Sequence, residues 1–488
     1  MELSLTHILM MLLTMLAIIA SGILAAGRAR TSEGFSLNGR KGSWPMVCGA
    51  VAGASIGGGS TIGTSQMAFS CGLSAIWFTL GVGIGLIFMA VFFAGPLRRS
   101  GLETISQVLI GCYGRQSGPV ASIIASIGIF FSCLASMLPA IWLLSAMLGV
   151  SVYAAGAALM ILIAVYIYFG GMKGAAVSGI MKTVFIWSML TVTGFTAWDL
   201  LSDLPDPHLA FPEDSWFDVF SIGPGRCLEN IFSLIVGITC SQTYAQAVFS
   251  ATDARTARIG LLSAAAVSMP VGIPCVLAAM YMHAAHPETQ AILALPSFAL
   301  NYLHPVVAGI TIGALMMSLV SSVSGLTFGI STMLSRDICS PLFGLQTDRA
   351  VLRCNKILIL LISAGVIGFA LAHLDSQVLT WNFLSMSLRG SIFIPLAMAI
   401  MGWRRMAALW AVPSMLMSCL AAVVSREFLS LDIPPLFIGF IASSTVVFIG
   451  IVASRRLNHS LLKISARLRL AVSKRAKMLH RSHDKTIM

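Results

Sequence analysis

The chain has 488 residues, of which 57% are hydrophobic and only 10% are charged, and its mean hydropathy is +0.91. Soluble domains carry roughly 25% charged residues, so this composition excludes a soluble enzyme, a disordered chain and a secreted disulfide scaffold. The net charge of +12 does not indicate a nucleic-acid surface, because ten of the 30 Lys and Arg residues cluster between residues 455 and 485. The composition indicates an all-α polytopic membrane protein.

Long stretches without charge define the expected membrane spans. No charged residue occurs between Lys41 and Arg98, or between Arg115 and Lys173, and each interval can hold two helices of about 20 residues. In chain order, hydropathy predicts about 13 spans, at residues 5–26, 45–70, 74–96, 119–148, 151–169, 180–201, 227–249, 259–285, 303–333, 356–374, 379–402, 406–425 and 434–454.

The distribution of basic residues predicts how these spans are oriented. With this division of the chain, 27 of the 30 Lys and Arg residues fall on one side, whereas Arg226 and Arg426 fall on the other and Arg389 lies within a span. Basic loops stay in the cytoplasm, so we expect the N-terminus outside and the C-terminus inside a plasma (inner) membrane. The tail 455–488 is either a helix on anionic lipids of the inner leaflet or a disordered basic anchor.

The second span is unusual because glycine and hydroxyl residues are concentrated at its middle, in residues 52–64. Three consecutive glycines, Gly57–Gly59, weaken a helix and favour an unwound segment. Unwound carbonyls at membrane depth can coordinate a cation. Close helix packing through small residues is the alternative interpretation, and a phosphate-binding loop is a poor third, since Thr64 stands where that motif requires lysine.

The ninth span carries three serines on one face. Ser318, Ser321 and Ser322 fall within one helical turn. Their hydroxyl groups, together with free carbonyls, can bind a small hard cation without a carboxylate, although small-residue packing is again the alternative.

Several stretches occur together in a recognisable order. They are Glu33–Arg40, the glycine-rich span, Gly170–Gly174, Gln242-x-x-x-Gln246 followed by residues 254–258, the serine-rich span ending at Arg336–Ile338, and Pro395 with Gly402–Arg405. In these motifs the chain resembles the sodium/solute symporter family, which includes the sodium/proline and sodium/galactose cotransporters. The resemblance covers residues from about 5 to 454.

The resemblance implies a leucine-transporter-type fold with two inverted five-helix repeats. It places the repeats at residues 45–201 and 227–402, an extra helix at 5–26 and two more helices at 406–454, which together form one transmembrane domain followed by the basic cytoplasmic tail. The implied function is sodium-coupled symport of a small organic solute into the cell by alternating access. It implies no enzymatic activity and no cofactor besides sodium as the coupling ion.

The resemblance also implies a sodium site between the second and ninth spans. Its carbonyl ligands would come from Ala54, Gly57 and Ser318, and its hydroxyl ligands from Ser321 and Ser322. Arg389 could bind a solute carboxylate, pair internally or reach the surface, because a charge within a span costs about 2.5–3.5 kcal/mol. The full set of candidate solute contacts is Ser60, Thr61, Asn230, Ser233, Thr239, Gln242, Trp381, Asn382 and Arg389.

One departure from the family pattern concerns the coupling ion. Where the family often has Thr-Asp, this chain has Ile180-Met181 followed by Lys182. We interpret Lys182 as a snorkelling anchor at the inner leaflet, and the alternative is a proton-linked substitute for sodium. A proton-coupled symporter of the same fold is therefore the runner-up function, and a transporter-like channel or sensor is a weaker one. His283 and His286 are expected to be interface histidines and not metal ligands.

Overall fold

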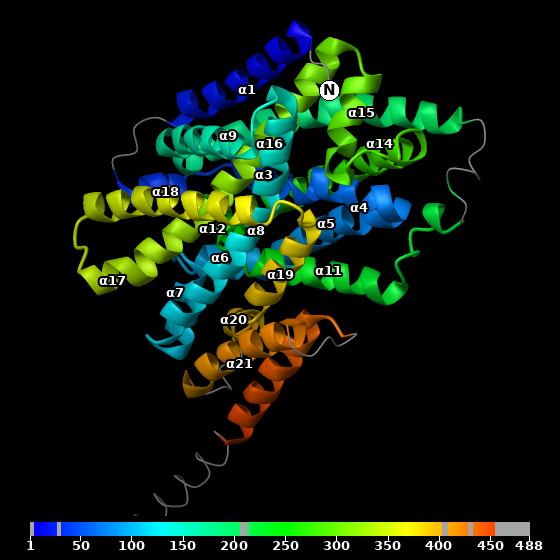
Figure 1. The fold of residues 1–488 in the computed structure, drawn as a ribbon. Helices are drawn as coiled ribbons and strands as arrows, with labels where there is room; N and C mark the ends of the chain where they lie inside the picture. Colours follow the sequence, from blue (N-terminus) through cyan, green and yellow to red (C-terminus); the bar gives the residue numbers. More distant parts are fainter. Residues whose placement is uncertain are drawn as a thin grey trace, which may run out of the picture.

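The computed structural model describes residues 4–26, 31–204, 211, 214–402, 408–427 and 433–453, and this part of the chain is helical without a β-strand (Figure 1). The helices are α1 (Leu5–Ala26), α2 (Ser32–Leu37), α3 (Trp44–Ser55), α4 (Thr64–Cys71), α5 (Trp77–Phe88), α6 (Ala94–Arg99), α7 (Ile105–Tyr113), α8 (Ser117–Leu148), α9 (Val152–Ser202), α11 (Pro224–Thr239), α12 (Gln242–Ser250), α13 (Ala254–Ser268), α14 (Gly272–Ala285), α15 (Ala294–Tyr302), α16 (Pro305–Met333), α17 (Ser340–Phe343), α18 (Asp348–Ala372), α19 (Val378–Gly390), α20 (Phe393–Ile400), α21 (Ala408–Glu427) and Pro435–Ala453.

The number of spans depends on how bent helices are counted. In the described part of the chain, nine helices are long and apolar enough to cross a membrane, and the count reaches 11 when each of two bent pairs is one span. The expected spans at 45–70 and 151–169 are not among them: the first is divided at a break, and the second contains only a shorter apolar helix, Val152–Ala164. The prediction of an all-α polytopic fold is confirmed.

The sequence predicts a break at Gly57–Gly59 and, at the corresponding place in the inverted second repeat, another near Gly237; both spans are broken. Helix α3 ends at Ser55, and Ile56 leaves the helical region with φ −84° and ψ 78° before a π-helical turn, η2 (Gly59–Gly63), resumes the direction of the chain. Helices α11 and α12 form a pair bent by 52°, with the break at residues 240–241, three residues beyond Gly237. A third pair, α19 and α20, is bent by 53°.

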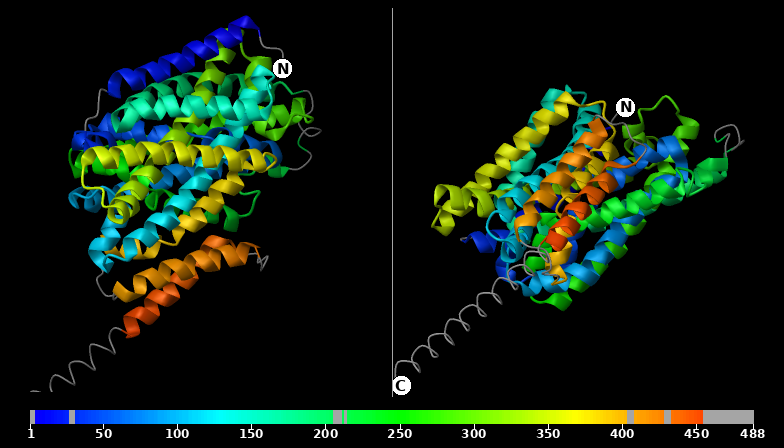
Figure 2. Two further views of the ribbon diagram at one scale, coloured as in Figure 1. Left: turned by 60° about the vertical axis from the view of Figure 1, so that its left-hand side comes forward. Right: turned by 90° about the horizontal axis from the view of Figure 1, so that it is seen from below.

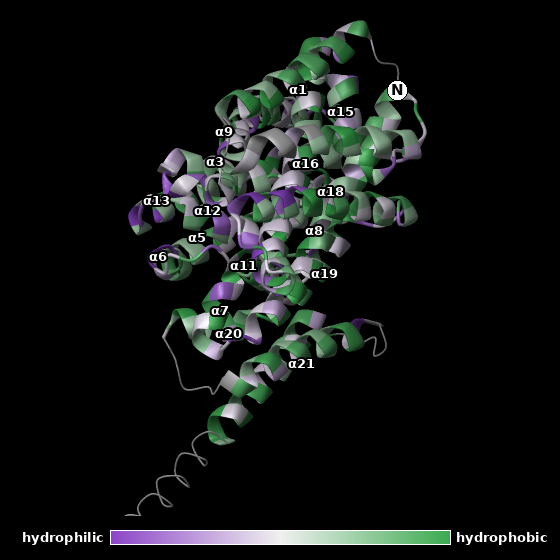
Figure 3. Cartoon of the chain, turned by 90° about the vertical axis from the view of Figure 1, so that its left-hand side faces the viewer, coloured by the Kyte–Doolittle hydropathy of each residue, from purple (hydrophilic) through white to green (hydrophobic). Residues whose placement is uncertain are grey.

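Helix α16 is the centre of the bundle. In the 18-residue apolar stretch of its span, 83% of the residues are buried, whereas in that of α1 only 28% are buried. Helix α16 packs against α1, α3, α8, α9, α12 and α18. Helix α21 and Pro435–Ala453 lie side by side at one edge of the bundle (Figure 2). Figure 3 shows that the peripheral helices α1 and α21 are largely hydrophobic, as expected for lipid-facing segments.

A stripe of glycines brings α9 unusually close to α3. A Cβ atom at Gly179 would lie 2.0 Å from the carbonyl oxygen of Gly49, and a Cβ atom at Gly53 would lie 3.2 Å from the Cα of Gly179. The two backbones therefore touch without side chains between them, as small-residue interfaces allow. This close approach determines which side chains of the next turn of α9 can reach the break in α3.

We expect Gly179→Ala to destabilise the protein, because the added methyl group has no room unless α9 moves away from α3. Overpacking of this kind costs about 1–3 kcal/mol. Gly368→Ala is the matched control, since a Cβ atom at Gly368 on α18 meets nothing within 4 Å. Thermal unfolding in detergent should show a lower Tm for Gly179→Ala and an unchanged or higher Tm for Gly368→Ala; equal Tm values would contradict this account of the helix contact.

Candidate functional site

The break after α3 releases backbone carbonyls into the centre of the bundle. The last carbonyl groups of a helix lack intrahelical partners, and here the break lies at membrane depth, where no lipid group can satisfy them. The carbonyl oxygens of Gly53, Ala54 and Ile56 all accept hydrogen bonds from side chains of other helices. The sequence predicted free carbonyls in this segment for this reason.

The three serines of α16 face these carbonyls. Ser318 Oγ donates to the carbonyl of Ile56 at 2.6 Å, and Ser322 Oγ donates to the carbonyl of Ala54 at 2.7 Å. Ser321 Oγ lies 3.5 Å from the carbonyl oxygen of Gly53 and 3.3 Å from that of Ser318. All three serines are buried. We name these three carbonyls and three hydroxyl groups the oxygen shell.

Lys182 is part of this arrangement, and its interpretation as a snorkelling anchor is wrong. The side chain is completely buried, and its Nζ atom donates to the carbonyl of Gly53 at 2.7 Å and to that of Ile56 at 2.8 Å. Helix α9 is kinked at Gly171, which has a φ of 53°, and the membrane span that follows is Gly171–Ser202. Lys182 lies 11 residues, or about 16 Å, along this span. The ammonium group therefore binds two backbone carbonyls inside the bundle and does not reach the end of the span.

The oxygen shell differs in detail from the ligands inferred from the sequence. Ala54, Ser321 and Ser322 take part as expected, whereas Ser318 contributes its hydroxyl group. The carbonyl of Gly57 accepts hydrogen bonds from Thr61 instead. Gly57 is required for another reason: a Cβ atom there would lie 2.2 Å from Ser322 Oγ, so only glycine lets the broken helix approach α16.

A cavity of about 50 Å³ lies directly beside the oxygen shell, between the two broken helices. We name it the central cavity. Two residues of the oxygen shell, Ala54 and Ser322, line this cavity, and so does Gly57 beside them. Residues of α5, α8, α11, α12 and α19 complete the lining. The polar and charged residues among its lining are Ser55, Ser60, Ser132, Ser136, Tyr244, Ser322, Asn382 and Arg389.

Three of the nine candidate solute contacts line the central cavity, namely Ser60, Asn382 and Arg389. The hydroxyl of Thr61 donates to the carbonyl of Gly57 in the break, and that of Thr239 is bonded within α11. The remaining candidates are not among the cavity's lining residues: Asn230 and Ser233 lie on other positions of α11, Trp381 stacks on Phe131 at 5.5 Å, and Gln242 is bonded to the backbone of residues 103 and 105.

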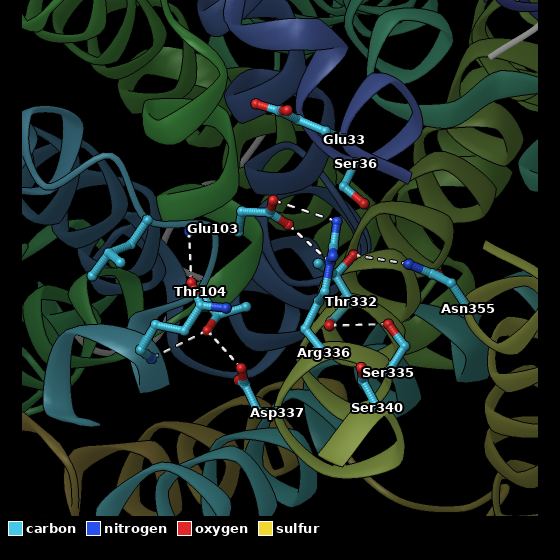
Figure 4. A network of polar contacts seen from close by, with 12 residues as sticks. Glu33, Ser36, Glu103, Thr104, Thr332, Ser335, Arg336, Asp337, Ser340 and Asn355 are labelled. Carbon is cyan, nitrogen blue, oxygen red and sulfur yellow. Dashed lines mark hydrogen bonds and ion pairs between the residues drawn. The ribbon is translucent and has the colours of Figure 1, made fainter. Parts of the chain in front are cut away.

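A second polar cluster lies at the C-terminal end of α16 (Figure 4). There α16 continues into a π-helical turn, η8 (Leu334–Cys339). Arg336 Nε lies 2.9 Å from a carboxylate oxygen of Glu103. The carboxylate of Asp337 accepts hydrogen bonds from Thr104 Oγ1 at 3.0 Å and Ser122 Oγ at 2.8 Å. We name Glu103, Thr104, Gln242, Arg336 and Asp337 the α16-end network.

The α16-end network joins three parts of the fold through one short loop. Gln242, the first residue of α12, donates to the carbonyl of Glu103 at 2.8 Å and accepts from the backbone N–H of Ile105 at 3.0 Å. The loop before α7 is therefore held by α12 on one side and by η8 on the other. The same helix that carries the second break is thereby tied to the end of α16.

Glu103 is the titratable group of this network outside the spans. Burial raises the pKa of Glu103 above the usual 4.5, and Arg336 acts in the opposite direction. Burial and the contact with Arg336, whose Nε and Nη2 atoms face the two carboxylate oxygens, therefore act on the pKa of Glu103 in opposite directions.

Within the described part of the chain, no three His, Cys, Asp or Glu side chains are grouped as metal ligands. His286 Nε2 instead contacts the hydroxyl of Tyr302 at 2.8 Å, and His283 packs on Trp216 with ring centroids 4.3 Å apart. These histidines are placed as packing and hydrogen-bonding groups. The expected basic tail, residues 455–488, lies outside the described residues.

Comparison with known proteins identifies a family that matches most of the chain. Residues 35–202 and 224–418 match the sequence profile of the sodium:solute symporter family. High affinity choline transporter 1 of Homo sapiens is 24% identical over 345 residues, and that of Mus musculus is 23% identical over 336 residues. Each match covers 65% of this chain, which spans 58% of the length of these relatives.

Two solved structures share the fold. A Na⁺-coupled sialic acid symporter in a substrate-bound, outward-open state superposes with a TM-score of 0.75 at 15% identity, covering 93% of this chain and 98% of the symporter. Mhp1, a nucleobase-cation-symport-1 family transporter in a closed conformation with bromovinylhydantoin bound, gives a TM-score of 0.58 at 12% identity, covering 86% and 94%. The predicted leucine-transporter-type fold is confirmed.

The pH dependence of stability should reveal the state of Glu103. Because its pKa is raised in the folded protein, the folded state binds this proton more tightly than the unfolded chain does. The stabilising contribution is therefore complete below pH 4.5 and is lost as the pH rises through the raised pKa. Glu103→Gln keeps the neutral form at every pH, so its Tm minus that of the parent should increase between about pH 4.5 and pH 7.5. A difference that decreases over this range would show that the ion pair with Arg336 outweighs burial.

Proposed function

The chain belongs to the sodium:solute symporter family, and on this premise we propose that it is a secondary active transporter. It carries a small organic solute into the cell by alternating access and couples this movement to sodium. The observation that carries the proposal is the oxygen shell, in which carbonyls of a broken helix meet three hydroxyl groups of α16 at membrane depth. No catalytic chemistry is part of this proposal.

The oxygen shell has the chemistry that a small hard cation requires. Carbonyl and hydroxyl oxygens suit alkali and alkaline-earth ions. The negative partial charge at the C-terminal end of α3 adds to the attraction. The shell holds oxygens from two elements, the break in α3 and the face of α16. A bound sodium ion would therefore fasten these elements together, and its departure would release them.

The positions of the cavity and the α16-end network support alternating access. The central cavity lies between two broken helices, as solute sites of inverted-repeat transporters do. If the N-terminus is outside, as the basic loops indicate, the α16-end network faces the cytoplasm. The ion pair between Glu103 and Arg336 would then close the route from the central cavity to the cytoplasm. The central cavity would stay reachable from the outer side of the membrane.

Sodium coupling supplies enough free energy for accumulation. One cation that moves down 100 mV gains about 2.3 kcal/mol. At 1.4 kcal/mol per factor of ten, this corresponds to roughly 50-fold accumulation of a neutral or zwitterionic solute; a monoanion that enters with one sodium ion moves no net charge and is driven by the sodium concentration gradient instead. The relatives named for choline and sialic acid support a small organic solute as the cargo.

Proton coupling is the second candidate, and the placement of Lys182 favours it. Its ammonium group and a sodium ion compete for the carbonyls of Gly53 and Ile56. Sodium can bind there only when Lys182 is neutral or has withdrawn. In the proton-coupled mechanism, the charged Lys182 takes the place of sodium and holds α9 to the broken end of α3. Loss of its proton then releases the two helices.

Uptake into proteoliposomes distinguishes the two candidates. We expect an inward sodium gradient, at equal pH on both sides, to stimulate solute uptake by the parent protein. The reason is that the oxygen shell supplies both the carbonyl and the hydroxyl oxygens that bind sodium. Lys182→Gln should retain this stimulation. Stimulation by an inward proton gradient alone, lost in Lys182→Gln, would replace sodium by the proton. Lack of stimulation by either gradient with every solute tested would contradict secondary transport itself.

Removal of the serine hydroxyls should weaken the dependence on sodium without unfolding the protein. Ser321→Ala and Ser322→Ala each delete one oxygen of the shell, so each should raise the sodium concentration for half-maximal uptake several-fold. Ser324→Ala is the matched control, because Ser324 is buried on the same helix and its hydroxyl group has no hydrogen-bond partner within the described part of the chain. Unchanged sodium dependence in the first two variants would show that sodium binds elsewhere.

A further inference from the structure

Arg389 places a full positive charge at the wall of the central cavity. It lies in the last turn of α19, its side chain is 3% exposed, and it is one of the cavity's lining residues. Its Nη2 atom donates to Ser132 Oγ at 3.0 Å, and its Nε atom donates to the carbonyl of Ser385 at 3.3 Å. A guanidinium group has five N–H donors and stays protonated in proteins, so it retains donors for a ligand.

Among the residues that the structure describes, no carboxylate neutralises this charge. Across the described ranges, no Asp or Glu oxygen lies within 4.0 Å of the Arg389 nitrogens, and the lining of the central cavity includes no acidic residue. Its hydrogen-bond partners are a hydroxyl and a carbonyl, which are dipoles. A buried charge without a counter-charge is strongly unfavourable, and an anionic ligand in the cavity would supply the missing charge.

The surrounding fold is built around this side chain. A Cβ atom at Gly128 on α8 would lie 2.5 Å from Arg389 Cγ, so α8 leaves room for the arginine stem only because this residue is glycine. The short helix that resumes at Gly59 begins at the same cavity, and the N-terminal end of a helix carries partial positive charge. Ser60 and Asn382 add a hydroxyl and an amide to the cavity wall.

We propose, resting on the transport function proposed above, that the solute carries a carboxylate group that binds the guanidinium of Arg389 in the central cavity, whose volume of about 50 Å³ in this conformation must widen to admit the rest of the solute. Arginine and carboxylate form a planar pair with two parallel hydrogen bonds. The same charge opposes a quaternary ammonium solute such as choline, and the cavity has only Phe78 and Tyr244 as aromatic residues to offset that repulsion. The substrate class of this chain therefore differs from that of its choline-transporting relatives.

Direct binding to the purified full chain tests the proposal without any ion gradient. The probes are propionate, lactate and proline, each with its uncharged or cationic amide (propionamide, lactamide and prolinamide), and choline. We expect at least one carboxylate to raise the Tm in a concentration-dependent way and its amide to fail. Propionate and lactate represent simple anions, while proline represents zwitterions, so the panel also separates these two sources of a carboxylate.

Arginine variants locate the binding site. Arg389→Gln should raise the Kd for the carboxylate at least about tenfold, because a charge-assisted pair is lost, and Arg389→Lys should restore part of the affinity. Ser387→Ala is the matched control on α19, since its hydroxyl is bonded within the helix to Phe383 and it does not line the cavity. If Arg389→Gln does not fold, the Kd of Arg389→Lys and the comparison of each acid with its amide on the parent protein still test whether Arg389 binds a carboxylate.

Failure of this proposal can be told apart from failure of the transport function. If no carboxylate binds, or if an amide or choline binds as tightly as the acid, the carboxylate assignment is overturned, while gradient-driven uptake of another solute would leave the transport function intact. Carboxylate binding at Arg389 without uptake under any gradient would leave the assignment standing and overturn transport.

Discussion

Backbone carbonyls that lose their helical partners at membrane depth must find other donors or a cation, and this constraint organises the centre of the protein. The break at Ile56 exposes the carbonyls of Gly53, Ala54 and Ile56. Three serines and one lysine, from two other helices, converge on them. Because these groups are buried, each of these contacts matters more than it would at a surface.

The glycines explain how these groups come together. Gly49 and Gly179 let α9 touch α3, which brings Lys182 within reach of the break, and Gly57 lets the broken helix touch α16 at Ser322. The bent pair α11–α12 contributes Leu234, Gly237, Ile238 and Tyr244 to the lining of the central cavity and places Gln242 in the α16-end network. In the proposed cycle, the ion site, solute site and closing contacts therefore share elements that can move together.

Most of the fold could be predicted from the sequence, because charge-free intervals and basic loops follow directly from membrane insertion. The break near Gly57–Gly59 and the serine face of α16 were also predictable, since both are local patterns. The role of Lys182 was not. Its position in the chain fits a loop-proximal anchor, and only the helix start at Gly171 and the contact between Gly49 and Gly179 place it at the break.

The solute contacts were harder still to predict. Polar residues of broken helices serve both as ligands and as internal hydrogen-bond partners, and sequence does not separate the two. Thr61 and Thr239 donate to backbone carbonyls three to four residues earlier in the chain, and Gln242 holds a loop, whereas Asn382 and Arg389 line the central cavity. Which face of a helix meets a cavity depends on tertiary packing, which hydropathy and spacing do not encode.

The central claim is that the oxygen shell binds the coupling cation and that Lys182 competes with it. Equilibrium binding of ²²Na⁺ to purified parent protein and to Lys182→Met tests this most directly, because it needs neither a solute nor a gradient. The account predicts saturable sodium binding that becomes tighter when the ammonium group is removed from Gly53 and Ile56. Equal binding in the two proteins, or none in either, would contradict it.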